Sequence, residues 1–246
     1  MNRSPVAKRL SPITAAEMSQ PRSAADMLPW ALDAHHRFTR TKTLRDLARS
    51  GAGFAKELSQ EALPMARFAH RYFGASPEVL ITHVLGNQQY DGTVDDRRTL
   101  LGDIRYIEIT DSTWDHNEAK RNELLSRDGT APGYGKVHAE GPKGRRSHLE
   151  GEYEMRDVNA MPTGQLQRVR EVVEAKAAKT YPDGTALVVH VDDAITFRDP
   201  AAVNELIAHA RTVLVPLLSG REFRVLILDG ANHLYQAFGL PLTASA

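Results

Sequence analysis

Two short, continuous apolar runs constrain the fold of this chain more than any other feature. They read "TALVVHV" from Thr185 to Val191 and "FRVLILDG" from Phe223 to Gly230. Runs of this length without polar alternation are typical of strands that are buried on both faces, as in a parallel sheet. Apolar positions at helical spacing precede the first run, from Pro162 to Lys179, and separate the two runs, over residues 198–218. We therefore predict crossover connections and an α/β domain with a central mixed sheet.

The region upstream of these runs predicts a helix followed by a three-strand meander. A helical stripe covers residues 54–72, with Pro64 expected to kink it. Short strand patterns separated by Gly and Asp turns follow near residues 77–86, 90–94 and 103–110. A further helix is predicted over residues 111–129, and a last strand near 233–239 completes the pattern. The predicted order of the core is helix, three-strand meander, helix, strand, helix, strand.

Three other segments do not fit this core pattern. Residues 1–24 lack periodicity and predict a disordered leader, whereas residues 25–52 predict an N-terminal helical extension. A polar, Gly-rich insertion is predicted near residues 128–161, within a domain that spans residues 53–246.

The composition excludes several classes of site. The 31 basic and 31 acidic residues cancel, so a site for a polyanion has to be local. The chain has no cysteine, which excludes disulfides, zinc-cysteine sites and thiol catalysis and is compatible with a cytoplasmic location. The apolar runs are far shorter than the ~20 residues that cross a bilayer, so we predict no membrane segment.

Two carboxylates stand out in the predicted meander. Strand alternation places Glu108 on one face with Tyr106 and Thr110. That face is either exposed to solvent or covered by a helix, and a covered carboxylate needs a partner or a metal. Asp91 is either part of a simple Asp-Gly turn or the second carboxylate of the same site.

Further polar residues fall inside apolar helical stripes. At 100° per residue, Glu61 lies within the stripe of the first predicted helix, unless it only borders the core. In the helix after Pro162, Lys176 falls between apolar positions with Gln165 beside it in angle, although a lysine there can also extend to solvent. These three residues can point toward the site of Asp91 and Glu108.

This order of elements, with an aspartate on one strand and a Glu-x-Thr on the next, resembles the PD-(D/E)XK nuclease superfamily. The resemblance covers roughly residues 54–238 and implies a restriction-endonuclease-like core. Asp91 and Glu108 match the motif acids, and Thr110 occupies the position of the motif lysine. The helix "QLQRVREVVEAKAAKTY" looks similar to helices of this superfamily that carry a displaced lysine or glutamine, here Lys176 and Gln165. Glu61 corresponds to the first-helix acid of some branches, while the proline that usually precedes the motif aspartate is absent.

The resemblance implies a metal-dependent phosphodiester hydrolase that acts on DNA in preference to RNA. Asp91 and Glu108 would bind Mg²⁺ or Mn²⁺, a hard cation that prefers carboxylate oxygen. Because threonine carries no charge, Lys176 would have to supply the positive charge missing at Thr110. The segment "GPKGRRSHLEG" is either a solvated loop or a basic patch for backbone phosphates. Its candidate contacts are Lys143, Arg145, Arg146 and His148.

Two alternative functions stay open at the level of sequence. A chain without the motif lysine could be a catalytically inactive, nuclease-like module that binds partners through its N-terminal helices. Alternatively, the adjacent Asp192 and Asp193 after a parallel-type strand could serve a different α/β hydrolase, because ligands often bind at the carboxyl ends of such strands.

Overall fold

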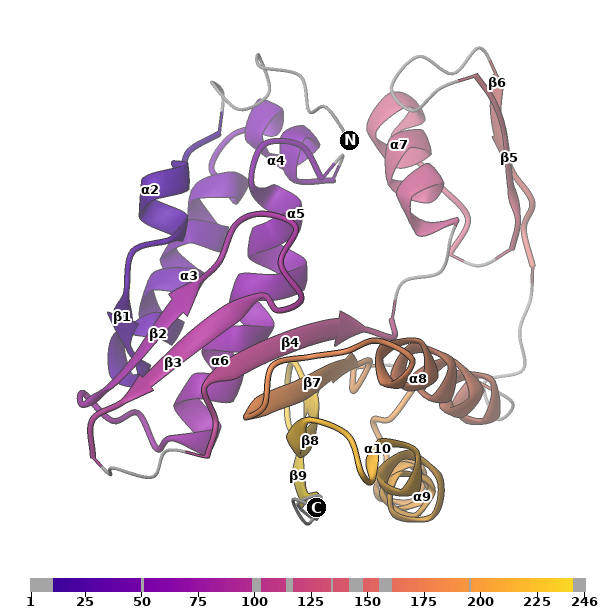
Figure 1. Cartoon of the computed structure of the whole chain (residues 1–246). Helices are drawn as coiled ribbons and strands as arrows, with labels where there is room; N and C mark the ends of the chain where they lie inside the picture. The colour runs from indigo at the N-terminus through magenta and orange to yellow at the C-terminus, as the bar shows by residue number, and fades with distance from the viewer. Residues whose placement is uncertain are drawn as a thin grey trace.

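A seven-stranded mixed sheet forms the centre of the computed structural model, which confirms the predicted α/β class (Figure 1). The structure describes residues 11–49, 51–98, 103–113, 117–133, 135–141, 148–154, 161–194 and 196–240. The strand order is β1-β2-β3-β4-β7-β8-β9. These strands are β1 (Arg22–Ser23), β2 (Val79–His83), β3 (Gly92–Asp96), β4 (Tyr106–Asp111), β7 (Thr185–Val191), β8 (Phe223–Gly230) and β9 (Tyr235–Gly239).

Strand pairing agrees with the predicted meander and crossovers. The strands β2, β3 and β4 pair antiparallel in sequence order. The strands β4, β7 and β8 pair parallel, and β9 returns antiparallel along β8. The pairing of β1 with β2 was not predicted. Parallel neighbours need long crossovers, which the helices between β4, β7 and β8 provide.

Helices cover both faces of this sheet and explain the apolar runs. The helices α3 (Ala24–Thr39) and α6 (Leu63–Tyr72) share one core with Ile107 and Ile109 of β4. The opposite core contains α8 (Met161–Ala177) together with α9 (Pro200–His209), η3 (Ala210–Leu214) and α10 (Val215–Leu218). In β8, alternate residues enter the two cores, so both sides of the strand have to be apolar.

Two π-helical turns precede prolines within helices. The turn η1 (Leu58–Ala62) follows α5 (Ala55–Glu57) and ends two residues before Pro64. The turn η3 ends two residues before Pro216 in the same way. Proline has no N–H for the carbonyl four residues earlier and its ring clashes with that carbonyl, so a wider turn accommodates it. Glu61 lies within η1.

The structure corrects the predicted N-terminal organisation. Residues 11–24 are ordered, with α2 (Ala15–Met18) and β1 in this stretch, so the disordered leader predicted through residue 24 is wrong there. Ile13 and Met18 are buried although their spacing shows no period, because α2 is too short to display one. Helix α3 shares a core with α6 and is therefore part of the domain, not an extension that ends near residue 52. The predicted role of these helices in binding a protein partner stays a prediction.

The polar insertion contains ordered elements of its own. Helix α7 (Glu118–Asp128) packs on the two-stranded sheet of β5 (Val137–Glu140) and β6 (His148–Gly151). Leu124, Val137 and Leu149 form its small core. Figure 1 shows this lobe standing apart from the central sheet. The lobe thus includes α7 and begins earlier in the chain than the predicted insertion near 128–161.

One segment of the described residues, Pro200–Leu218, is long and apolar enough to cross a membrane by length and composition. Its residues Leu206, Leu214 and Leu218 are buried in the core beneath β7 and β8.

Candidate active site

Pairing of β3 with β4 brings Asp91 beside Glu108. Gly92 is in register with Ile107, so the residue before Gly92 lies next to the residue after Ile107. The Asp91 N–H donates to the Ile107 carbonyl at 2.8 Å, and its Oδ2 accepts the Ile109 N–H at 2.7 Å. These contacts hold the Asp91 carboxylate against β4 and make it more than a turn residue.

Two side chains, one from α8 and one from the segment just after it, donate hydrogen bonds to Glu108. Lys176 near the end of α8 donates through Nζ to Glu108 Oε1, and the Tyr181 hydroxyl donates to the same oxygen at 3.3 Å. Glu108 is only 7% exposed, so the predicted alternative of a solvent-facing carboxylate is wrong. Burial and the charge of Glu108 both raise the pKa of Tyr181, which keeps its hydroxyl protonated as a donor.

Asp91 titrates far above its usual range. Burial is the main cause, followed by repulsion from Glu108 and then Glu61, and together they raise the pKa of Asp91 to about 7. The Ile109 N–H and the charge of Lys176 act in the opposite direction. Asp91, Glu108, Glu61 and Lys176 therefore form one electrostatic cluster, as predicted from their positions in the sequence.

Glu61 is oriented by a histidine that the sequence did not single out. His83, the last residue of β2, is fully buried and its Nε2 lies 3.0 Å from Glu61 Oε2. No partner of His83 Nδ1 is found among the described residues. The π-helical turn η1 carries Glu61 to this position, and such turns often occur at functional sites.

Other predicted site residues lie elsewhere. The Gln165 side chain donates to the Ser112 carbonyl at 2.8 Å at the end of β4 and makes no contact with Asp91 or Glu108. Thr110 is half-buried on the Glu108 side of β4. His148 is half-exposed and lies 3.3 Å from Glu150, in an ion pair that needs a protonated imidazole. Three other predicted phosphate contacts lie outside the described residues, namely Lys143, Arg145 and Arg146.

The negative charge of this cluster decides whether its residues could hold a divalent cation. Within the described residues, no group of three or more His, Cys, Asp or Glu is arranged to hold a metal ion. Mg²⁺ however usually binds through one or two carboxylates together with water and substrate phosphate. Asp91 and Glu108 supply two carboxylates. Burial is the main cause of the raised pKa of Asp91, and a cation would relieve the repulsion between the acids that adds to it. The residues therefore fit Mg²⁺ or Mn²⁺ held by this pair.

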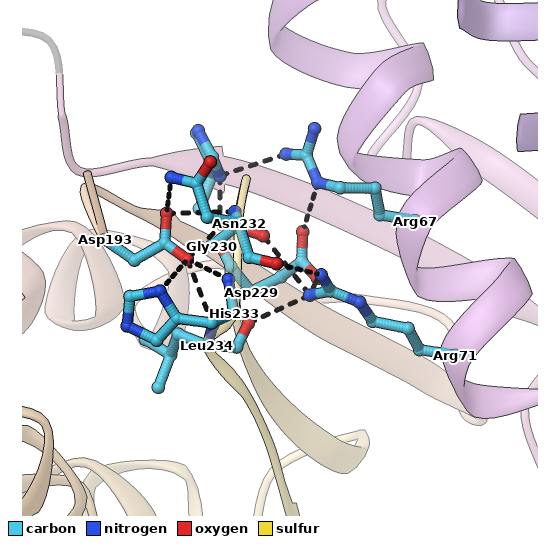
Figure 2. Close-up of polar contacts among 9 residues, drawn as sticks. Arg67, Arg71, Asp193, Asp229, Gly230, Asn232, His233 and Leu234 are labelled. Atoms are coloured by element: carbon cyan, nitrogen blue, oxygen red, sulfur yellow. Dashed lines mark hydrogen bonds and ion pairs between the residues drawn. The ribbon is translucent and has the colours of Figure 1, made fainter. Parts of the chain in front are cut away.

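A second buried polar cluster lies at the carboxyl ends of β7 and β8 (Figure 2). The fully buried Asp229 is paired with Arg67 and Arg71 of α6, each at 2.8 Å. Burial raises the pKa of Asp229 above its usual value, while the charges of the two arginines act against this shift. Arg71 also donates to the carbonyls of Gly230 and Leu234. These contacts fasten the loop after β8 to α6.

Asp193 fastens the same loop from the end of β7. Its carboxylate accepts the backbone N–H groups of Asn232, His233 and Leu234 at 2.7–3.1 Å, as Figure 2 shows. Burial alone would raise the pKa of Asp193, but the hydrogen bonds from this loop leave it below its usual value. Its neighbour Asp192 accepts the N–H of Ala194 in a local turn. These hydrogen bonds give both aspartates a structural role in holding the backbone near the ends of β7 and β8.

Asp193→Ala is expected to destabilise the protein by about 2–4 kcal/mol, because it leaves the buried N–H of Leu234 and the part-buried N–H groups of Asn232 and His233 without their acceptor. Urea unfolding followed by circular dichroism measures this change. The exposed Asp95→Ala serves as the matched control and should leave the free energy of unfolding nearly unchanged. Unaltered stability of Asp193→Ala, combined with lost catalysis, would instead favour the alternative hydrolase.

Asp91→Asn is expected to change how stability depends on pH. Because the folded-state pKa is raised from 3.8 to about 7, the metal-free wild type loses stability as the pH rises through this window. Asparagine removes the charge and can still accept the Ile109 N–H. The variant should be more stable than the wild type by on the order of 4 kcal/mol at pH 8, and this gain should vanish below about pH 4. Thermal unfolding in EDTA across pH tests this, and parallel curves for the two proteins would refute it.

Comparison with known proteins gives no match to this chain: no family model, no curated protein and no solved structure is similar to it. The assignment of a function therefore depends on the contacts of Asp91, Glu108, Lys176 and their neighbours.

Proposed function

We propose that the protein is a metal-dependent phosphodiester hydrolase that cleaves nucleic acid, with DNA as its preferred substrate. We further propose that its fold is a divergent form of the PD-(D/E)XK nuclease core. One observation carries the proposal: Asp91, the residue before β3, lies beside Glu108 of β4, and the ammonium group of Lys176 reaches Glu108 from α8.

Asp91 and Glu108 are the residues that would hold Mg²⁺ or Mn²⁺. A bound divalent cation would acidify a water molecule and neutralise negative charge on the phosphate. The three acids of the cluster outnumber its one lysine, so the site lacks positive charge in the absence of a cation. A substrate phosphate adds further negative charge, which makes this lack of positive charge more severe.

The protein groups around these acids have separable tasks in hydrolysis. The reaction joins a water oxygen to phosphorus and breaks one phosphorus–oxygen ester bond, so water loses a proton and the departing oxygen gains one. The proton of the attacking water would pass to solvent, because Asp91 would be ionised and occupied in holding the cation. Lys176 stabilises the charge that develops on the phosphate, and Tyr181 fixes Glu108 by donating to Oε1.

The Lys176 position supports an active enzyme over an inactive binding module. Position 110 carries a threonine in place of the motif lysine. The ammonium group of Lys176 in α8 instead contacts Glu108, two residues before Thr110. A lysine that only extended to solvent would not need a buried partner, and its side chain is 19% exposed here. The positive charge of Lys176 beside Glu108 therefore favours an active enzyme.

The test is a cleavage assay with single-stranded and double-stranded DNA and RNA. We expect cleavage of DNA in Mg²⁺ or Mn²⁺ and none in EDTA. Asp91→Asn, purified in parallel, controls for contaminating nucleases. Absence of cleavage by the wild type on every substrate, with nucleic-acid binding retained, would reject the enzyme and favour the binding module.

A further inference from the structure

Positive charge is concentrated in one short part of an otherwise balanced chain. Residues 34–56 contain six Lys and Arg against one Asp, a net charge of +5, so the rest of the chain carries −5. Helix α4 (Lys42–Arg49) lies at the middle of this stretch. Such an asymmetry in a chain of zero net charge produces a strong local field.

The cations of this stretch are on the surface. Lys42, Arg45 and Arg49 follow each other at helical spacing on one face of α4, and all three are exposed. Arg40 at the end of α3 and Lys56 in α5 are exposed beside them in sequence. We call these five residues the α4 basic face.

Arg37 of this stretch pairs with Glu17 and Asp33. Among the described residues, little of the charge of the α4 basic face itself is neutralised. Arg49 lies 3.5 Å from Asp46, and Arg45 donates to the Thr39 carbonyl, which has no net charge. No hydrogen bond or ion pair of the Arg40 or Lys42 side chain is found among the described residues. Exposed cations with this spacing can exchange their counterions for phosphates.

The other side of α4 argues against a membrane as the partner. Leu47 and Ala48 pack against the buried cluster that contains Phe54 and Leu58. A helix that binds a bilayer surface needs a free apolar face to insert, and α4 uses its apolar side within the protein. A polyanion that needs only charge fits better.

The α4 basic face is connected to the candidate active site through the chain. Helix α4 contacts α5, and α5 continues directly into the turn η1 that carries Glu61. Lys56 precedes Glu61 by five residues, which is roughly 8 Å along a helix axis. One continuous helical segment thus joins Lys56 of the α4 basic face to Glu61 of the site.

We propose that the α4 basic face binds the sugar-phosphate backbone of the nucleic acid on which the proposed active site acts. This inference rests on the proposed function for its choice of ligand. The contact is to phosphates and not to bases, so it sets the path of the substrate without selecting a sequence.

The experiment measures binding of a fluorescein-labelled 20-base-pair DNA duplex by the full chain in EDTA, over a series of salt concentrations. The test variant is Arg40→Gln/Lys42→Gln/Arg49→Gln, which spares Arg45 because it also bonds to Thr39. The control Lys179→Gln/Arg211→Gln/Arg221→Gln removes the same charge from exposed positions near α8 and α10. Thermal unfolding verifies that each protein is folded.

The test variant is expected to bind at least about 10-fold more weakly at moderate salt, with the slope of log K against log salt reduced by about 2 to 3. The control should bind like the wild type. Equal losses in both variants, or wild-type binding to phosphatidylserine vesicles but not to DNA, would overturn the proposal. Binding that depends on this face without any cleavage would support it while rejecting the proposed enzyme. Cleavage by the test variant at the wild-type rate, measured at moderate salt, would reject the role of the α4 basic face while supporting the proposed enzyme.

Discussion

Glu108→Gln is expected to reduce the rate of DNA cleavage by about 10³-fold. The substitution keeps the shape of the side chain but removes the charge that would bind the cation and that pairs with Lys176. Glutamine can still accept the hydroxyl of Tyr181, so the strand should keep its packing. Initial rates at saturating Mg²⁺ measure the effect, and thermal unfolding shows that the variant is folded.

A matched control for this variant is Glu174→Gln. Glu174 lies in α8 two residues before Lys176 and is paired with Arg170 at the surface. Its loss should change the cleavage rate by less than about twofold, because exposed ion pairs contribute little. Equal rates for Glu108→Gln and Glu174→Gln would show that Glu108 has no part in catalysis.

Lys176→Met is expected to reduce cleavage by about 10²-fold, the usual effect of losing one electrostatic contact to a transition state. Methionine keeps most of the apolar stem but removes the charge. Among the described residues, Glu108 then keeps only the Tyr181 hydroxyl as a donor, so a loss of stability of about 1–3 kcal/mol is also expected. Single-turnover cleavage by folded protein separates this catalytic effect from the loss of stability.

Two further variants serve as a control and a rescue for Lys176→Met. Lys179→Met, at an exposed position just after α8, should cleave like the wild type. Thr110→Lys in the Lys176→Met background should recover part of the rate, since position 110 lies on the Glu108 side of β4. Full activity of Lys176→Met would contradict the idea of a displaced lysine.

The strands that carry the site could be predicted because burial leaves a period in the sequence. In β4, Ile107 and Ile109 enter one core, which fixes Glu108 on the opposite side. The parallel neighbours β7 and β8 lack alternation because both of their faces are buried. The same logic of faces placed Lys176 inward on α8, and the structure confirms its contact with Glu108.

The same logic misplaced Gln165. Angle on a helix says which way a side chain points, but it does not say how far along the axis it lies. Gln165 and Lys176 share a direction, yet eleven residues separate them by roughly 16 Å. Gln165 therefore meets Ser112 at the far end of β4 instead of the carboxylates.

Partners that depend on tertiary contacts left no signal in the sequence. His83 ends an ordinary apolar strand, and Tyr181 follows α8 as one aromatic residue among several. Each gains significance only when the sheet and α8 come together around Glu61 and Glu108. The N-terminal elements were missed for a different reason, because α2 and β1 are too short to show a period.

Binding of Mn²⁺ measured by isothermal titration calorimetry tests whether Asp91 and Glu108 hold a cation. We expect the wild type to bind Mn²⁺ at a site that is lost in both Asp91→Asn and Glu108→Gln. Because Asp91 has a raised pKa and must release its proton, this binding should also strengthen from pH 6 to pH 8. The exposed Glu174→Gln should bind Mn²⁺ like the wild type. Unchanged Mn²⁺ binding by both carboxylate variants would show that Asp91 and Glu108 do not hold the cation.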